Sequence, residues 1–567
     1  MPQLPKPPLI PGEFPTIAAA LDYAAGSSNG IRFHDNHGAI TGQLSYKDLR
    51  TRALDIACRL KGMGFEREHR IGVVAETGPE FLSIFYGCQY AGLVPCPLPV
   101  RPRIGGSQAY DEQIGNMLRT GDIRTLIILP GQPGMDRIPA DQVTTFIDYD
   151  TLLQKAPGPL PDTITPDDAA YIQFSSGSTS NPKGILITQR AVAANAEAIL
   201  KYGMRLNSSD RAFSWLPFYH DMGLVGFSIA PLFGQCPIDY LPAIAFARRP
   251  VLWLRLMAEY GSTITYSPSF GYRLAAQRYL SEPETLDLSH LRITGIGGDM
   301  IHADILYQFA EALKETGFKA EAFLPSYGMA EATLAISFGK PGAGFEVDTV
   351  DRAKAETDGT IELVSSSGQE RLPVRSFVVC GFPLPGTDIR IVSEESLPLP
   401  DKRIGHVLFR GPNMMREYVG NPEETGHALR PDGYLETGDL GYLREGRIVI
   451  TGRTKDVILY RGRNVWPEDI EWTAEQALKL NHGNVVAFSL ESENGGDDQV
   501  VILVQSRTAD ERERTLLTEQ VHQAISQTYG ISSTVVPVPH GTIPKTSSGK
   551  LARARARTIF NKLKSEV

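Results

Sequence analysis

Cysteine is scarce in this sequence, and its pattern excludes two common ways of stabilising a fold. The cysteines are odd in number and widely spaced, and no two of them form a Cys-x-x-Cys pair. They are Cys58, Cys88, Cys96, Cys236 and Cys380. A disulfide framework or a zinc site needs paired cysteines, so neither is expected. We predict a reduced, cytoplasmic protein.

A strong charge imbalance and a long apolar run are missing as well. The formal net charge is only -9 over 567 residues, which argues against nucleic acid as the main partner. The uncharged stretch at residues 81–100 contains three prolines near its end, which would break a membrane-spanning helix. The first twelve residues hold five prolines and no apolar core of a signal peptide. We therefore do not expect an integral membrane protein.

What the sequence does contain is a regular alternation of strand-like and helix-like segments. Apolar residues make up 42% of the chain, and 567 residues exceed what a single core holds, so several subdomains are expected. Strands at residues 70–75, 93–98 and 125–129 alternate with helices, and a second series runs through residues 190–266. This order predicts an α/β protein whose large N-terminal domain contains two doubly wound α/β subdomains.

The pattern changes twice toward the C-terminus. A polar, charged passage at about residues 345–374 interrupts the alternation and is interpreted as an insertion on the surface. Short β-rich segments after it, up to residue 451, predict a small β-barrel-like subdomain. Near Gly452 the pattern becomes that of a compact α+β domain. We predict an N-terminal domain at residues 1–452 and a small, mobile C-terminal domain at residues 453–567, joined by a short hinge.

The stretch YIQFSSGSTSNPKGI, residues 171–185, has the composition of a polyphosphate-binding loop. Glycine lets backbone N–H groups turn inward, while hydroxyls and Lys183 add donors for oxyanions. A Walker A loop is excluded, because its Gly-Lys pair must be followed by Ser or Thr, whereas Lys183 precedes Gly184 here. An ordinary serine-rich surface loop is the alternative.

Two further motifs follow predicted strands. WLPFYHDMGL, residues 215–224, lies where an open α/β sheet presents its ligands. Its His220 and Asp221 are open to three interpretations, namely a base with its orienting group, a gate, or a buried pair. SYGMAEATL, residues 326–334, places Tyr327 and Gly328 in a predicted turn and Glu331 near a helix start. Tyr327 could then stack on a purine, and Glu331 could bind Mg²⁺. The helix dipole alone also favours a glutamate at a helix start.

The remaining motifs lie around and beyond the predicted domain boundary. YLETGDLG, residues 434–441, predicts a tight turn that offers Asp439 to the hydroxyls of a ribose, with a hairpin turn and a solvated aspartate as the alternative. GRTKD follows at residues 452–456, where Arg453 is placed to share that ribose. GTIPKTSSGKLAR, residues 541–553, is a basic loop that contains Lys545 and Lys550.

In this order, the motifs resemble those of the adenylate-forming superfamily of acyl-CoA synthetases, luciferases and peptide-synthetase adenylation domains. The resemblance covers roughly residues 46–557. HDMGL, YGMAEATL and the VVCGFPLPG run at residues 378–386 resemble the fatty acyl-AMP ligases more than the acyl-CoA ligases. Those ligases carry a family-specific insertion, for which residues 345–374 are the candidate.

The resemblance implies that a fatty carboxylate attacks the α-phosphate of ATP in the presence of Mg²⁺, which gives acyl-adenylate and pyrophosphate. It implies Lys550 as the catalytic lysine, His220 as a gating or positioning group rather than a base, Glu331 as the Mg²⁺ ligand and Lys455 as the hinge. The residues implied to hold the departing phosphates are Ser175, Ser176, Gly177, Ser178, Thr179 and Lys183. Tyr327 is implied to stack on adenine, and the other residues of the adenine site are Gly297, Gly298, Asp299, Ser326, Gly328 and Met329. Asp439 and Arg453 are implied to hold the ribose.

The resemblance further implies transfer of the acyl group to the phosphopantetheine thiol of a separate acyl carrier protein. A medium- or long-chain acyl-CoA synthetase, with coenzyme A as the acceptor, is the alternative. A peptide-synthetase adenylation domain would need an acidic residue for the amino group of its substrate, whereas residues 227–233 are largely apolar and residues 264–270 carry no charge. Both stretches predict walls of an acyl tunnel. A catalytically silent relative is disfavoured, because Lys550, Glu331, Asp439 and Arg453 are all present.

Overall fold

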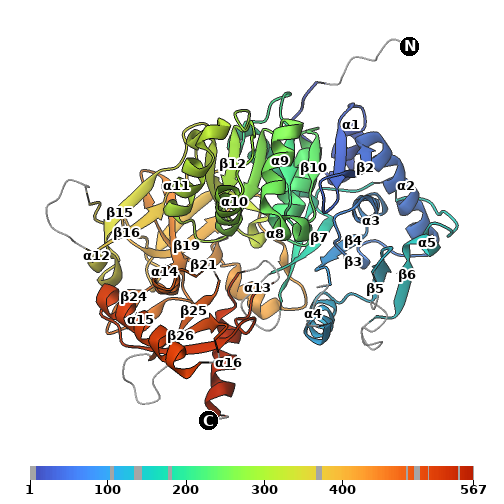
Figure 1. Ribbon diagram of the computed structural model, residues 1–567. Coiled ribbons are helices and arrows are strands. Elements are labelled where there is room, and N and C mark those ends of the chain that lie inside the picture. The colour runs from blue at the N-terminus through green and yellow to red at the C-terminus, as the bar shows by residue number, and fades with distance from the viewer. Residues whose placement is uncertain are drawn as a thin grey trace.

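The computed structural model describes residues 8–101, 107–132, 143–161, 163–175, 182–364, 373–480, 483–490, 499–508, 510–546 and 550–565. Figure 1 shows the N-terminal elements α2, α3 and β3–β6 on one side of the molecule, and the C-terminal elements α14–α16 gathered below the large central sheet. Within the described residues, no helix combines the length and the apolar character needed to cross a membrane. All five cysteines are free thiols.

A nine-stranded sheet forms the centre of the N-terminal region. Its middle strands are parallel, and antiparallel strands complete both edges. Most of the middle strands are short runs buried along their length, as expected for parallel strands that are covered on both faces. In spatial order the strands are β17 (Phe382–Pro383), β14 (Ala335–Phe338), β13 (Phe323–Gly328), β12 (Ile293–Ile296), β11 (Ile264–Ser267), β9 (Ala212–Ser214), β10 (Ile238–Tyr240), β1 (Gly30–His34) and β2 (Ile40–Ser45).

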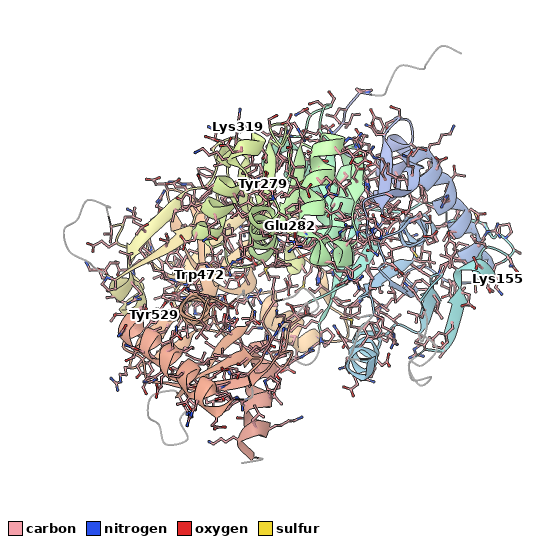
Figure 2. All side chains as sticks on the ribbon, in the orientation of Figure 1. Lys155, Tyr279, Glu282, Lys319, Trp472 and Tyr529 are labelled. Carbon is pink, nitrogen blue, oxygen red and sulfur yellow. The ribbon has the colours of Figure 1, made fainter. Side chains whose placement is uncertain are left out.

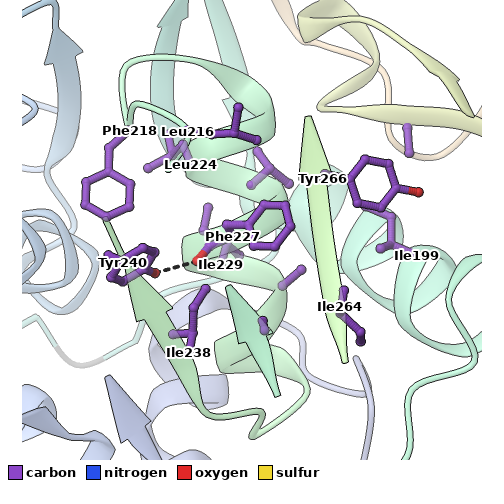
Figure 3. Packing of buried hydrophobic residues seen from close by; sticks show 14 of the residues in the cluster. Ile199, Leu216, Phe218, Leu224, Phe227, Ile229, Ile238, Tyr240, Ile264 and Tyr266 are labelled. Carbon is purple, nitrogen blue, oxygen red and sulfur yellow. Dashed lines mark hydrogen bonds between the residues drawn. The ribbon is translucent and has the colours of Figure 1, made fainter. Parts of the chain in front are cut away.

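Two groups of helices pack with this sheet into one large apolar core. The first group is α8 (Ala243–Arg248), α9 (Pro250–Tyr260), α10 (Ser269–Ser281) and α11 (Ala303–Ala312), followed by the short turns η4 (Lys314–Thr316) and η5 (Ala320–Ala322). The second group is α1 (Ile17–Ala24), α6 (Gln189–Ala198), the π-helical segments η2 (Ile199–Gly203) and η3 (Met222–Ile229), and α7 (Ala230–Phe233). Figure 3 shows how η3 is held, because the Tyr240 hydroxyl on β10 donates to the Phe227 carbonyl.

A second, all-parallel sheet and a small antiparallel sheet complete the α/β part. The parallel sheet has the order β4 (Val94–Leu98), β3 (Arg70–Val74), β5 (Thr125–Ile128) and β6 (Thr145–Asp148), with α2 (Tyr46–Gly62), α3 (Pro79–Ala91), α4 (Ser107–Thr120) and α5 (Tyr149–Leu152) around it. The antiparallel sheet has the order β20 (Glu417–Tyr418), β8 (Gly184–Thr188) and β7 (Ala169–Phe174). The two parallel-stranded sheets confirm the predicted α/β class.

An antiparallel sheet stands where the small β subdomain was expected. Its strands are β18 (Asp388–Val392), β19 (Gly405–Arg410), β21 (Leu435–Arg444) and β22 (Arg447–Arg453). The tight turn predicted at residues 434–441 is wrong, because β19 and β22 pair with β21 on both sides and hold it as a strand. Gly438 adopts a φ of 71° within that strand. The turn predicted at Tyr327 and Gly328 is also wrong, since both residues end β13.

The C-terminal region has the expected α+β composition. Its elements are β23 (Ile458–Tyr460), β24 (Arg463–Val465), α14 (Pro467–Ala477), β25 (Val485–Leu490), β26 (Gln499–Ser506), α15 (Glu511–Tyr529), β27 (Ser533–Pro539) and α16 (Arg553–Ser565). It has two apolar clusters of its own, one on each face of the three-stranded sheet β25-β26-β27. Successive side chains along β25 and β26 belong alternately to one cluster and to the other. A separate core is what an independent small domain requires.

The passage predicted as an insertion folds as a hairpin with a helix. β15 (Val347–Asp351) pairs antiparallel with β16 (Val374–Val378), and α12 (Arg352–Thr357) follows β15. Residues 365–372 lie outside the described part of the chain. The remaining elements are η6 (Ala330–Ala332) after β13, and α13 (Pro422–Ala428) after β20.

Candidate active site

One cavity of about 1260 Å³ collects most of the residues singled out by the sequence motifs. Strands β11, β12 and β13 are parallel, so the segments that follow them meet at one edge of the sheet and line this cavity. The predicted site residues among its lining are Ser175, Lys183, His220, Gly298, Asp299, Ser326, Tyr327, Gly328, Met329, Glu331, Asp439, Arg453, Lys455 and Lys550. Gly297 does not line the cavity but directly precedes Gly298.

A buried hydrogen-bonded group joins β13 to the pair of strands β21 and β22. The Tyr327 hydroxyl donates to Asp439 Oδ2 at 2.7 Å, and Arg453 Nε lies 3.2 Å from Asp439 Oδ1. Asp439 and Arg453 face each other directly in the antiparallel register. Asp439 is only 5% exposed, so the predicted alternative of a solvated aspartate is wrong. The carboxylate of Asp439 raises the pKa of Arg453, which keeps the guanidinium charged.

Lys550 reaches the same cavity from the C-terminal region. Its backbone N–H donates to Thr546 Oγ1 at 3.2 Å, and its carbonyl accepts from the Thr546 N–H at 2.7 Å, so two hydrogen bonds hold Lys550 next to Thr546. Burial and the neighbouring charge of Arg453 lower the pKa of Lys550, while Asp299 and Asp221 oppose that change. Lys545 also lines the cavity, but it lies near Glu475 instead.

The polyphosphate loop is described only at its two ends. Ser176, Gly177, Ser178 and Thr179 lie outside the described residues. At the ends, the Ser175 N–H donates to the Lys183 carbonyl at 2.9 Å, and the Lys183 N–H donates to Ser175 Oγ at 3.1 Å. Reciprocal bonds of this kind hold the two arms of a loop together. The Lys183 ammonium pairs with Glu424 and lies 4.6 Å from the centre of the Tyr418 ring.

Glu331 is held by a residue that the sequence analysis did not single out. The Tyr418 hydroxyl donates to Glu331 Oε1 at 2.8 Å. Tyr418 and Glu424 both line the cavity, and they belong to the stretch EYVGNPEET at residues 417–425. An Asn-Pro pair followed by two glutamates marks a helix start, which is the only signal that this stretch carried.

His220 and Asp221 stand at the beginning of η3. His220 lines the cavity, and its carbonyl accepts from the Leu224 N–H at 2.8 Å. Asp221 accepts from the Met222 N–H at 2.8 Å, as a residue that caps the helical segment. Burial raises the pKa of Asp221, while Lys550 lowers it. The pair therefore combines a structural capping role with a place on the cavity wall.

The cavity also has an extensive apolar wall. Of the two stretches predicted as tunnel walls, residues 264–270 contribute Tyr266, Pro268, Ser269 and Phe270, whereas residues 227–233 contribute Phe227 alone. Other large apolar residues that line the cavity include Ile199, Met204, Trp215, Phe246, Leu334 and Phe338. Such a surface suits an alkyl chain, because burying each CH₂ group contributes roughly 0.8 kcal/mol.

The chain turns directly after β22, at the residue predicted as the hinge. The N–H groups of Asp456 and Val457 donate to the Arg453 carbonyl at 3.1 and 3.2 Å. Lys455 lies within this turn and lines the cavity, and burial lowers its pKa. The hinge at Lys455 stays a prediction.

The donors in the cavity fit Mg²⁺ better than a metal held by protein alone. Among the described residues, no three His, Cys, Asp or Glu side chains gather in a way that could hold a metal ion. Mg²⁺ commonly takes one or two carboxylates, with water and substrate phosphates as its other ligands. The carboxylate of Glu331, with the Lys183 ammonium on the other side of Tyr418, meets that requirement.

Comparisons with known proteins agree with this geometry. A family model described as "AMP-binding enzyme" matches residues 30–419. A protein of Caulobacter vibrioides named "Putative acyl-CoA synthetase" is 42% identical over 97% of this chain and 96% of its own length. JamA of Moorena producens, named a medium-chain fatty acid–acyl carrier protein ligase, is 32% identical over 97% of this chain and 95% of its own length. A structure solved in studies of fatty acyl-adenylate ligases from E. coli and L. pneumophila has a TM-score of 0.91 and 36% identity, and the match covers 99% of this chain and 100% of that one.

Proposed function

Because the chain belongs to the AMP-binding enzyme family and is an adenylate-forming ligase, we propose that it activates a fatty acid with ATP and then transfers the acyl group to the phosphopantetheine thiol of a separate acyl carrier protein. The observation that carries the proposal is the single cavity that joins an extensive apolar wall to Asp439, Arg453, Glu331 and Lys550. A cytoplasmic location and the exclusion of nucleic acid stay predictions from composition.

ATP is placed by three groups of residues in this proposal. Asp439 and Arg453 hold the ribose hydroxyls, and Tyr327 lies beside adenine with the segment at residues 297–299. Lys183 and Ser175, with the other residues of the polyphosphate loop, hold the β- and γ-phosphates. Glu331 would hold Mg²⁺, which when bound neutralises charge on the phosphate oxygens. The alkyl chain of the fatty acid lies against the apolar wall.

In the first step, an oxygen of the fatty carboxylate attacks the α-phosphorus of ATP. A new oxygen–phosphorus bond forms, the bond to the bridging oxygen of the β-phosphate breaks, and the electron pair leaves with pyrophosphate. Lys550 meets the charge that develops on the α-phosphate, which is an electrostatic role. A carboxylic acid is already ionised at neutral pH, so the step needs no general base, and His220 positions the reacting groups instead.

In the second step, the sulfur of the acceptor thiol attacks the acyl carbonyl carbon. A thioester forms, AMP leaves with the electron pair, and the thiol proton passes to the solvent. Two acceptors fit this chemistry, the phosphopantetheine arm of a carrier protein and coenzyme A. The name of JamA favours the carrier protein, and the name of the C. vibrioides relative favours coenzyme A.

Contacts of the β15–β16 segment support the carrier protein. We define this segment as residues 347–378. Its helix α12 touches the C-terminal region, where Arg463 Nη1 lies 3.2 Å from Glu356 Oε2 and Arg352 stacks 4.7 Å from the Tyr529 ring. Figure 2 labels Tyr529 at this border. On β16, Arg375 Nε lies 2.7 Å from Asp469 Oδ2, and its guanidinium lies 3.8 Å from the Trp466 ring.

The same segment shares an apolar cluster with the C-terminal region. Val350, Ala355 and Phe377 pack with Trp466, which is 1% exposed. Contacts of both kinds stabilise the pose in which Lys550 lies in the cavity. A domain rotation that frees the acyl-adenylate for coenzyme A would have to break them, so the segment restrains that rotation in our proposal.

The function is tested by incubating the protein with ATP, Mg²⁺ and a series of fatty acids. Mass spectrometry then measures acyl-AMP, acyl-CoA and the acylated form of the carrier protein after addition of each acceptor. We expect acyl-AMP to accumulate and to be consumed by phosphopantetheine-loaded carrier protein, but not by coenzyme A. Consumption by coenzyme A at a comparable rate would favour the acyl-CoA synthetase instead. Absence of acyl-AMP with every fatty acid would contradict the proposed substrate.

Loosening the β15–β16 segment should let coenzyme A compete. The double variant Arg352→Ala/Arg463→Ala removes the ion pair with Glu356 and the bonds that both arginines donate to carbonyls at the end of α15. We expect acyl-CoA formation to rise about tenfold. Losing a few charge-assisted hydrogen bonds should shift the equilibrium between the pose with Lys550 in the cavity and the rotated pose by roughly 1–2 kcal/mol. Acyl-AMP formation should stay within about twofold.

Arg255→Ala is the matched control, since Arg255 pairs with Glu284 on the surface of the N-terminal region, at 2.5 Å. Arg255→Ala should change the formation of neither acyl-AMP nor acyl-CoA. If the double variant makes no more acyl-CoA than the control does, the restraining role of the segment is wrong.

The lowered pKa of Lys550 predicts that the rate of pyrophosphate release falls at alkaline pH, and that this alkaline limb of the pH profile begins at a lower pH than for an ordinary lysine. The ammonium form is present below that pKa and is lost as the pH rises through it, so the rate should begin to fall below the ordinary lysine value of 10.5. In Lys550→Arg the guanidinium stays charged at any accessible pH, so the limb should vanish even if the rate is lower. The measurement is a profile from about pH 7 to about pH 10, with the thermal midpoint recorded at each pH. Identical limbs in the two proteins would contradict the assignment.

A further inference from the structure

A short element far along the chain lies between two groups of the candidate site. The β20–α13 segment, residues 417–428, contains Tyr418 and Glu424. β20 pairs antiparallel with β8, which begins directly after Lys183, and Tyr418 faces Ile185 in that register. The Val419 N–H donates to the Gly184 carbonyl at 2.8 Å. The segment is therefore anchored next to the end of the polyphosphate loop.

The Tyr418 side chain contacts both Glu331 and Lys183. Its hydroxyl donates to Glu331 Oε1 at 2.8 Å, and the Lys183 ammonium lies 4.6 Å from the centre of its ring. Tyr418 is only 7% exposed, so its side chain is buried between these two groups. One side chain thus holds a carboxylate with its polar end and a cation with its ring face.

The backbone around Tyr418 is tied on both sides. Thr425 Oγ1 accepts from the Tyr418 N–H at 3.0 Å, and Asn421 Oδ1 caps α13 by accepting from the Glu424 N–H at 3.1 Å. The Met415 N–H donates to the Glu331 carbonyl at 2.8 Å. A side chain held in this way loses little further freedom when it positions another group, which makes its hydrogen bond effective.

We propose that Tyr418 is a positioning residue that couples the cation site at Glu331 to the polyphosphate site at Lys183. The proposal rests on the proposed function, since it assigns Mg²⁺ to Glu331 and the departing phosphates to Lys183. The hydroxyl restrains one carboxylate oxygen of Glu331 and leaves the other for the cation. The ring keeps the Lys183 ammonium beside that cation, so the two positive charges meet the same polyphosphate.

Glu424 limits how strongly the Lys183 ammonium can bind a polyphosphate. The Lys183 ammonium lowers the pKa of Glu424, so the carboxylate stays ionised and competes with a polyphosphate for the same ammonium. This competition weakens the grip on a polyphosphate that must leave after the first step. The ring of Tyr418 attracts the ammonium without adding a second negative charge.

Two substitutions separate the functions of the hydroxyl and the ring. Tyr418→Phe keeps the ring but loses the bond to Glu331, whereas Tyr418→Leu loses both. The readout is the equilibrium binding of ATP by calorimetry, first in EDTA and then over a titration of Mg²⁺, with no fatty acid present. Thermal unfolding of each variant is measured alongside.

For Tyr418→Phe we expect the affinity for ATP in EDTA to stay unchanged and the half-saturating Mg²⁺ concentration to rise about tenfold, the effect of one hydrogen bond to a charged group. For Tyr418→Leu we expect the same rise together with an affinity for ATP in EDTA that is about threefold weaker, because the cation–π contact is lost. A merely structural role would instead lower the thermal midpoint and weaken both kinds of binding equally.

Tyr442→Phe is the matched control. Tyr442 donates to a buried carboxylate, Asp348, at 2.7 Å, and it does not line the cavity. That variant should lose stability but bind ATP and Mg²⁺ as the unsubstituted protein does. An unchanged Mg²⁺ titration in Tyr418→Phe overturns the proposal, and this variant alone decides if Tyr418→Leu does not fold. Because no fatty acid is needed, the result can be interpreted even if fatty acids prove not to be the substrate.

Discussion

Replacing Lys550 by alanine is expected to slow acyl-adenylate formation by about a hundredfold to a thousandfold, the usual cost of losing one well-placed electrostatic donor at a reacting centre. ATP should still bind, because Asp439, Arg453 and Lys183 remain. The loss should therefore appear mainly in kcat, as expected for an interaction made in the transition state. The measurement is pyrophosphate exchange at saturating ATP with the fatty acid that gives the highest rate.

Stability should change little in Lys550→Ala. Burial and Arg453 lower the pKa of Lys550, which means that its charged form is less favourable in the folded protein than in the unfolded chain. Removing that charge should leave the thermal midpoint unchanged or raise it slightly. Lys545→Ala is the matched control, since Lys545 also lines the cavity and has a lowered pKa, but it lies near Glu475. Near-normal exchange in Lys550→Ala would contradict the catalytic assignment.

Asp439→Ala should produce the second large effect, a fall in kcat/KM for ATP of about a hundredfold. Two ribose hydroxyls lose a charged acceptor, and each such hydrogen bond contributes roughly 1.5 kcal/mol or more. The greater part of the loss should appear in KM. The Tyr327 hydroxyl and Arg453 also lose their shared partner, so the free energy of unfolding should fall by about 1–3 kcal/mol.

A modified nucleotide separates ribose recognition from general damage to the site. With 2′,3′-dideoxy-ATP, the unsubstituted protein and Asp439→Ala should have nearly equal kcat/KM, because the contact that the variant lacks is then absent in both. Asp388→Ala is the control, since Asp388 accepts from the Tyr434 hydroxyl and from Arg410 in a similar triad outside the cavity. It should keep normal kinetics with both nucleotides. A large difference between the proteins with the dideoxy nucleotide would show that Asp439 does not act through the ribose.

Much of the fold could be predicted because its signals are local. Within the alternating series expected at residues 190–266 lies the helix α9 (Pro250–Tyr260), which starts with a proline and is followed by Gly261 in the left-handed region. The short β-rich segments expected before residue 451 include the strands β18 and β19. Apolar spacing, an initial proline and a final glycine act within a few residues, so they can be interpreted without knowledge of the partners.

The errors came from segments whose structure depends on distant partners. Glycines at residues 438 and 441 predicted a turn, yet β19 and β22 supply hydrogen bonds on both sides and extend β21 to ten residues. The same cause explains Tyr327 and Gly328, which pair with β14. Turn-forming residues set a preference that a well-paired sheet can override.

Tyr418 was missed for a related reason. It lies 87 residues from Glu331 in the sequence, and its neighbour Glu424 lies 241 residues from Lys183. Neither stands in a pattern whose chemistry can be recognised locally. Only the pairing of β20 with β8 brings the four side chains together.

The sequence by itself determined which chemical groups the protein has and in what order, and that was enough to identify the family. The tertiary structure decided which of these groups meet. Lys550 comes 367 residues after Lys183, and it reaches the same cavity because the C-terminal region packs against the N-terminal sheets and the β15–β16 segment. The physical reason is that chemical type is a property of each residue, whereas distance within a site is set by non-local packing, in which many weak contacts act together.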